Sequence, residues 1–178
     1  KSILKKLSNS LHLRRISFSI PEEKIINYLP QKEKLFTKHI VDPEVCKKVP
    51  GSYEDYAFSN EYEYYEDLRK SKFGITTKRA GWDALRHYEI AANATVPCFL
   101  DLNLKPKTCA PHGLNSSNCI IYSNYFDLMN KIDNMSEFEY ALYQSNAIKW
   151  ARENSSRSRA IKLLKETNQW KKFLAFRY

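Results

Sequence analysis

The side chains best suited to chemistry lie in one short stretch of the sequence. Lys78 and Arg79 are adjacent cations, and Gly81 follows them just before a segment with helical periodicity. Arg86 and Glu89, three residues apart, share one face of that helix. Helix amides and cations favour an anion such as a phosphate or diphosphate, and a carboxylate can accept two hydrogen bonds from the vicinal hydroxyls of a ribose. This spacing predicts a nucleotide site.

A second interpretation of Arg86 and Glu89 is a surface ion pair of little energetic weight. For that pair alone, the ion pair is the simpler explanation. The neighbouring cations favour a binding site, because a strand ends at Thr77 directly before them. Ligands of open α/β sheets bind beyond the carboxyl ends of the strands.

Short β-type segments alternate with helix-type segments along the chain. This pattern is typical of an α/β fold, here a Rossmann-like, doubly wound and mostly parallel sheet with trailing C-terminal helices. We expect strands at residues 15–20, 35–41, 56–58, 72–77, 95–100 and 118–122. We expect helices after Asp42, after Asn60, over Trp82–Ala94, over 124–132, after Ser136 and from Arg157 towards Phe173. Residues 1–135 form the Rossmann-like unit, and residues 136–178 are helices that pack on it within the same domain.

Capping residues support several of these helices. Asp42, Asn60 and Asn124 are expected N-caps, and Ser136 with Glu139 forms a capping box. We interpret the acids between residues 54 and 67 as a solvated helix face. The tyrosines Tyr62, Tyr64 and Tyr65 are interpreted as core and interface filler.

Composition excludes several classes of protein. The chain has 178 residues and only 4 glycines, so neither the dinucleotide motif G-x-G-x-x-G nor a P-loop can be assembled. The four cysteines are scattered, and no Asp-x-Asp motif occurs, so we expect neither a zinc site nor another metal site. No apolar run is long enough to cross a membrane and residues 1–13 lack a signal-peptide pattern, which favours a cytoplasmic protein.

The net charge of +9 is concentrated at the two ends. Residues 1–15 carry five bases and no acid, and residues 149–178 carry nine bases and two acids. The alternative function is therefore a non-catalytic binding module that docks through its basic ends on a partner domain, an acidic polymer or a membrane surface. The final WKKFLAFRY suits peripheral contact with an anionic membrane; the favoured interpretation is a helix whose aromatics pack on the core. No common nucleic-acid-binding motif is present, so we expect no nucleic-acid partner.

The stretch from Ser71 to Leu102 resembles the nucleotide-sugar-binding signature in the C-terminal half of GT-B glycosyltransferases, most of all the exostosin-like group. The elements of the resemblance are the strand 73–77, the basic loop Lys78–Arg79, the R-x-x-E helix with Arg86 and Glu89, and the strand that begins Val96–Pro97. The resemblance implies that Glu89 holds the donor ribose. It also implies that Lys78, Arg79 and Arg86 neutralise the donor diphosphate.

By this resemblance the chain is the donor-binding domain of a glycosyltransferase of polysaccharide biosynthesis. It would transfer a sugar from a nucleoside-diphosphate sugar to a glycan or other polar acceptor, with an acceptor domain N-terminal to it and outside this chain. Binding of the donor would need no metal and no further cofactor. The catalytic base is not identified. The expected donor-binding residues are Thr77, Lys78, Arg79, Gly81, Arg86, Glu89 and, on the long loop 103–117, His112.

Overall fold

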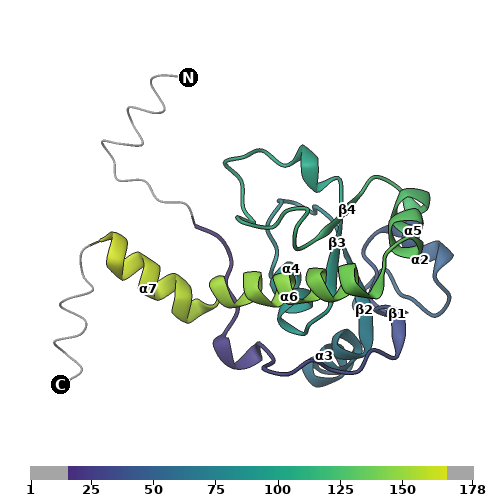
Figure 1. Cartoon of the computed structure of the whole chain (residues 1–178), viewed down its shortest axis with the longest axis horizontal. Helices are drawn as coiled ribbons and strands as arrows, with labels where there is room; N and C mark the ends of the chain where they lie inside the picture. Colours follow the sequence, from purple (N-terminus) through teal and green to yellow (C-terminus); the bar gives the residue numbers. More distant parts are fainter. Residues whose placement is uncertain (1–15, 168–178) are drawn as a thin grey trace.

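A computed structural model describes residues 16–167 of the chain (Figure 1). Its centre is a four-stranded, all-parallel sheet in which the strands neighbour one another in the order β1-β2-β3-β4. The strands are Lys34–Phe36 (β1), Ser71–Thr76 (β2), Val96–Leu100 (β3) and Ile120–Tyr122 (β4). The predicted α/β fold is confirmed. The strands lie side by side in the same order as in the sequence, so the described strands contain no point at which the strand order reverses.

Helices connect and cover the strands. They are Glu22–Lys24 (η1), Pro43–Lys48 (α2), Glu61–Lys70 (α3), Leu85–Ala92 (α4), Leu102–Leu104 (η2), Tyr125–Asp133 (α5), Glu137–Glu153 (α6) and Ser156–Glu166 (α7). The expected N-caps are confirmed, since Asp42, Asn60 and Asn124 each accept a hydrogen bond from a backbone amide of the first helical turn. Ser136 and Glu139 form the complete capping box.

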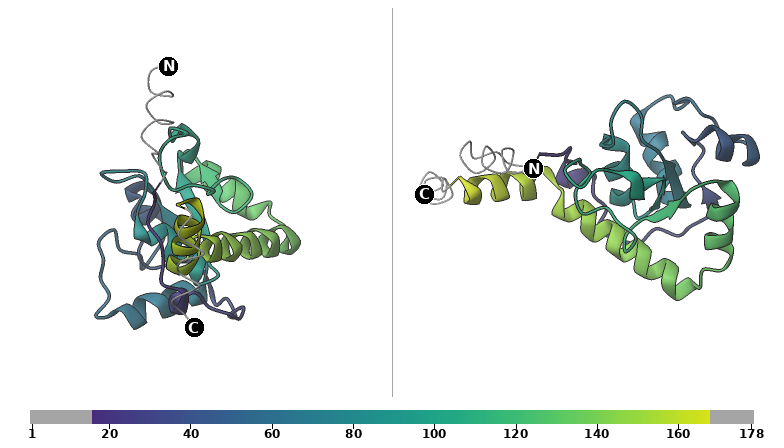
Figure 2. Two further views of the ribbon diagram at one scale, coloured as in Figure 1. Left: turned by 90° about the vertical axis from the view of Figure 1, so that its left-hand side faces the viewer. Right: turned by 90° about the horizontal axis from the view of Figure 1, so that it is seen from above.

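Alternating side chains of the strands build two apolar layers, one on each face of the sheet. On one face, Phe73 and Ile75 of β2 pack in a cluster with Leu128 of α5. On the other face, Phe99 of β3 lies in a cluster with residues of α4 and α6. Gly74 also points to this second face, where α4 lies so close that a Cβ at this position would stand 2.8 Å from Ile90. The two views in Figure 2 show helices on both sides of the sheet.

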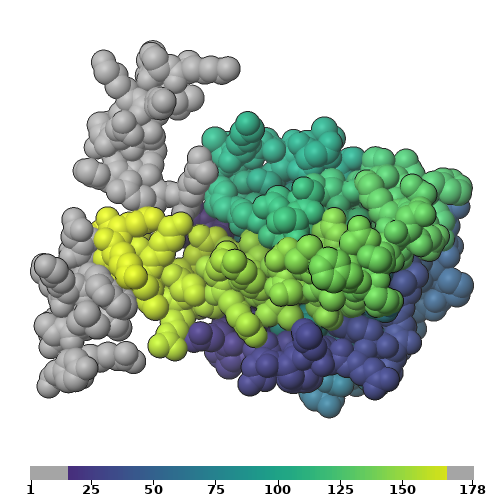
Figure 3. Space-filling view, in the orientation of Figure 1, coloured from purple at the N-terminus to yellow at the C-terminus, as the bar shows by residue number. Residues whose placement is uncertain are grey.

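Helix α6 packs on the body of the fold, whereas α7 extends beyond it. Tyr140 of α6 contacts Phe73 with ring centroids 5.5 Å apart, and Trp150 stacks on Tyr88 of α4 at 4.7 Å. Helix α7 projects from the molecule in Figures 1 and 3, and none of its residues is buried. The helix expected as far as Phe173 ends at Glu166, and residues 168–173 lie outside the described residues.

Two expected strands are wrong. Residues 16–20 make only a single bridge, from Ile20 to Ser155, and residue 15 lies outside the described range. Residues 56–58 form no strand, because Tyr56 and Phe58 pack their rings against Tyr64 of α3 instead of extending the sheet. The expected strand 35–41 stops at Phe36. Within residues 16–167, no helix combines the length and the apolar character that a membrane crossing requires.

Candidate functional site

The end of β2 carries a hydrogen-bonded hub that orients the first turn of α4. The hydroxyl of Thr76, the last residue of the strand, accepts a hydrogen bond from Arg86 Nε at 3.1 Å. The same hydroxyl lies 2.9 Å from His87 Nδ1, and His87 Nε2 lies 3.0 Å from the carbonyl of Trp82. A carbonyl can only accept, so His87 donates through Nε2 and accepts the Thr76 proton at Nδ1. One buried threonine thus fixes two neighbouring side chains.

Beyond the carboxyl ends of β1 and β2 lies a cavity of about 250 Å³. Helices α3 and α4 form its two walls, and the segment after β1 closes a third side. Its lining residues are His39, Tyr56, Glu61, Tyr64, Arg86 and Glu89. The volume is below the range of roughly 300–1,000 Å³ of sites that enclose whole drug-sized ligands. The cavity therefore suits part of a larger ligand, such as a pentose with one attached phosphate.

Two unpartnered nitrogen atoms border this cavity. In the described part of the chain, three buried side-chain nitrogens lack a hydrogen-bond partner, and two of them are Arg86 Nη2 and His39 Nδ1. A buried donor without an acceptor costs about 1–3 kcal/mol, and more when it is charged. Within residues 16–167 no ion pair joins Arg86 to Glu89, so the surface-pair interpretation of this R-x-x-E does not describe the structure. The guanidinium keeps an N–H group for an incoming oxygen ligand.

Glu89 faces the same cavity and is held by two phenols. Tyr65 Oη donates to Glu89 Oε1 at 3.2 Å, and Tyr64 Oη donates to Glu89 Oε2 at 3.4 Å. Burial raises the pKa of Glu89 above its ordinary value, while the hydrogen bond from Tyr65 acts in the opposite direction. The predicted position of Glu89, one turn further along the helix on the Arg86 side, agrees with the structure.

His39 adds a neutral ring to the cavity. Burial, followed by the nearby Arg86 charge, lowers the pKa of His39 below its ordinary value. The ring lies edge-on to Tyr56 at 5.8 Å and to Tyr64 at 6.5 Å. The cavity therefore has one permanent cation, one neutral imidazole and two carboxylates, Glu89 and the more exposed Glu61.

The two adjacent cations lie in the loop that follows β2, and both are exposed. Lys78 Nζ sits 5.5 Å from the Trp82 ring centroid, and the Arg79 charge contributes to lowering the pKa of both His39 and Arg86. Gly81 is exposed, and a Cβ there would meet nothing within 4 Å, so the fold itself does not require a glycine at this position.

Helix α4 begins at Leu85, three residues later than expected. Two side chains just before the helix make contacts elsewhere, and Ala84, the residue before Leu85, is extended. Trp82 stacks on Phe99, and Asp83 accepts hydrogen bonds from the Phe18 amide and the Tyr88 hydroxyl. Residues 80–84 therefore separate Lys78 and Arg79 from the helix, and the first helical turn carries Arg86 itself.

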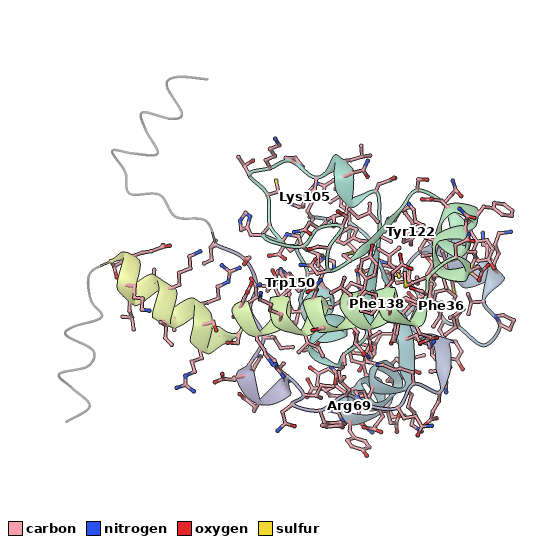
Figure 4. The ribbon with its side chains drawn as sticks, in the orientation of Figure 1. Phe36, Arg69, Lys105, Tyr122, Phe138 and Trp150 are labelled. Carbon is pink, nitrogen blue, oxygen red and sulfur yellow. The ribbon has the colours of Figure 1, made fainter. Side chains whose placement is uncertain are left out.

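Not every expected residue joins the cavity. Thr77 is buried directly after β2, and its hydroxyl donates to the carbonyl of Lys78. His112 belongs to another region, where its carbonyl accepts the indole N–H of Trp150 on α6 at 2.9 Å. Figure 4 labels Trp150 on α6 and Lys105 on the loop that also carries His112. The structure does not bring His112 to Arg86 and Glu89.

Sequence reasoning overlooked several residues of this site. Thr76 and His87 form the hub, and His39, Tyr64 and Tyr65 complete the cavity and its carboxylate. Tyr64 and Tyr65 were expected as filler, yet their hydroxyls contact Glu89 some 25 residues away in sequence. Spacing within one helix does not predict a contact between two helices.

The arrangement can bind an anion next to a diol, with cations on one side and a carboxylate on the other. Among residues 16–167, no group of three or more His, Cys, Asp and Glu side chains is placed to hold a metal ion. Donor binding without a metal stays a prediction.

Comparison with known proteins does not extend this description. No family model matches the chain, and no curated protein matches it at a significant level.

Proposed function

We propose that this chain binds a nucleoside-diphosphate sugar and serves as the donor-binding domain of a GT-B-type glycosyltransferase. The sugar would pass to a glycan or other polar acceptor. The observation that carries the proposal is that one cavity, beyond the ends of β1 and β2, contains both the unpartnered Arg86 Nη2 and the carboxylate of Glu89. The resemblance of residues 71–102 to the exostosin-like signature supports the same function.

The size and charge of the site support a nucleotide in a definite orientation. A cavity of about 250 Å³ takes the pentose at Glu89. In this proposal the diphosphate extends past Arg86 to the exposed Arg79, whose charge acts on both Arg86 and His39, and to its neighbour Lys78. The transferred sugar would lie outside the cavity, where an acceptor can reach it.

The chemistry open to these residues is stabilisation of the leaving group. As the glycosidic bond breaks, negative charge grows on the nucleoside diphosphate. Arg86 is largely buried and held at Nε by Thr76, so its remaining N–H groups are already oriented before charge develops. Preoriented donors in a partly dry site stabilise developing charge more than mobile surface cations do. The base that activates the acceptor is not among the residues assigned here.

The experiment starts with a thermal-shift screen against uridine, guanosine and cytidine diphosphates and their sugars, followed by calorimetry on the best ligand. Arg86→Ala should weaken binding about 10- to 100-fold, because it removes charge-assisted hydrogen bonds to phosphate. Arg157→Ala is the matched control, since Arg157 lies on α7, is mostly exposed and pairs with Glu22.

The nucleotide affinities of wild type and of the Arg86 variant decide whether Arg86 belongs to the site. Loss of affinity in the Arg86 variant alone, with an unchanged melting temperature of the free protein, supports the site. Equal affinity for wild type and Arg86→Ala would remove Arg86 from the site, and the absence of any nucleotide binding would remove the proposal.

The docking alternative makes a different prediction. Helix α7 exposes the bases Lys162 and Lys165, and none of its residues is buried. If the chain docks on an anionic surface, Lys162→Glu with Lys165→Glu should weaken salt-sensitive flotation with phosphatidylserine vesicles. The same double variant should leave nucleotide affinity unchanged. Wild-type protein that does not float at low salt would exclude membrane docking.

A further inference from the structure

Helix α3 directs two adjacent tyrosine hydroxyls at one carboxylate on α4. Tyr65 Oη contacts one oxygen of Glu89 at 3.2 Å and Tyr64 Oη contacts the other at 3.4 Å. Adjacent residues of a helix are about 100° apart, so two neighbours rarely converge on one group. Here both hydroxyls reach the carboxylate of Glu89. Each carboxylate oxygen therefore has its own phenol donor.

Both rings are held in place by packing. Tyr64 and Tyr65 are only 5% and 7% exposed. Phe58 and Tyr56 pack against the Tyr64 ring with centroids 5.4 Å and 5.5 Å away, and Lys24 Nζ lies 5.5 Å from the Tyr65 ring centroid. A tyrosine has only two side-chain torsions, so rings packed in this way give the hydroxyls little freedom. The carboxylate is oriented before any ligand arrives.

Both phenol groups act as hydrogen-bond donors to Glu89. Burial, and then the neighbouring Glu89 charge, raise the pKa of both Tyr64 and Tyr65 above its ordinary value, so both keep their protons. The second carboxylate of the cavity, Glu61, is paired with Lys24 and also interacts with the Tyr65 hydroxyl. The Tyr65 hydroxyl makes its 3.2 Å hydrogen bond to Glu89.

Counting lone pairs shows what Glu89 can still accept. An ionised carboxylate has about four acceptor positions, two on each oxygen. The tyrosines use one on each oxygen, which leaves one on each oxygen for a ligand. A vicinal diol presents two O–H donors side by side, and a single hydroxyl presents only one. The unoccupied acceptor positions therefore match a diol.

We propose that Tyr64 and Tyr65 are the specificity-determining residues of this site: by fixing both oxygens of Glu89 they make it select the 2′,3′-diol of a ribose over a deoxyribose. This inference rests on the proposed function of nucleotide binding. The two tyrosines act through Glu89 and are positioning residues.

The test compares ribose and deoxyribose ligands by calorimetry. The probes are the nucleoside diphosphate with the largest thermal shift among the uridine, guanosine and cytidine forms, and its 2′-deoxy analogue. The preference of wild type for the ribose form should fall about tenfold in Tyr64→Phe with Tyr65→Phe, because a freely rotating carboxylate no longer presents both acceptors. Affinity for the 2′-deoxy form should change little. Tyr62→Phe, whose ring is 70% exposed on the same helix, is the matched control.

A second arm repeats the two substitutions in the Glu89→Gln background. There the phenylalanines should cause no further loss of preference, because the group that they position is already altered. Melting curves of every variant check that the fold is intact. An unchanged preference in the tyrosine variants, or equal losses for both ligands, would overturn this inference alone. Wild type that binds no nucleotide would overturn the proposed function as well.

Discussion

His87 should make the protein lose stability as the pH falls from 6.5 to 4. The ring is fully buried, and burial, followed by the Arg86 charge, lowers its pKa from 6.5 to about 4. Between these two pH values, His87 is protonated in the unfolded chain and neutral in the folded protein. Stability therefore decreases with falling pH, by about 1.4 kcal/mol for each pH unit. Over this interval the loss amounts to about 3 kcal/mol.

The assay is denaturant unfolding at a series of pH values, followed by tryptophan fluorescence, for wild type and His87→Gln. A glutamine does not titrate and can still donate to the Trp82 carbonyl. Glu89 has the opposite effect, since a raised carboxyl pKa favours the folded state at low pH. Its contribution is common to both proteins, so the difference between the two curves isolates His87. Parallel curves, or an NMR titration of the His87 ring near 6.5, would refute the reasoning.

Three further substitutions test the framework around the site. Gly74→Ala should lower the free energy of unfolding, measured in urea, by about 1–3 kcal/mol, because the new Cβ would stand 2.8 Å from Ile90. Gly81→Ala should unfold like wild type, because no atom lies within 4 Å of the new Cβ. If Gly81→Ala nevertheless weakens nucleotide binding in calorimetry, a ligand passes close to that backbone. Thr76→Val should lower the free energy of unfolding by about 2–4 kcal/mol, because it leaves Arg86 Nε and His87 Nδ1 without hydrogen-bond partners. A near-neutral effect would show that these hydrogen bonds contribute little to stability.

The sequence predicts the layers of this fold well because local rules decide them. Residues 72–77 and 95–100 are short segments with many β-branched and aromatic side chains, and they form β2 and β3 nearly at the expected bounds. Asp42, Asn60, Asn124 and Ser136 each cap the helix that directly follows them, so their capping role can be predicted from the local sequence. Aromatic runs are less informative. Residues 56–58 have strand propensity, but their rings pack on α3.

The site was predictable only in part. Arg86 and Glu89 lie on one helix, so their spacing alone places them in a common cavity. The groups that orient them come from other elements: Thr76 from the end of β2, and the tyrosines from α3. His112 was expected from its place on a long loop, but that loop turns back, and the Trp150 indole holds it beside α6. Contacts between elements depend on how the elements pack, and spacing along the chain does not encode that.

Backbone hydrogen bonds join the segment before η1 to the junction of α6 and α7. Ile20 donates its amide to the Asn154 carbonyl and accepts one from the Ser156 amide, at the junction of α6 and α7. Two residues earlier, the Phe18 amide binds Asp83, which lies three residues before Arg86. The chain before η1 is therefore bonded at two points, to the junction of α6 and α7 and, through Asp83, to the segment that precedes α4.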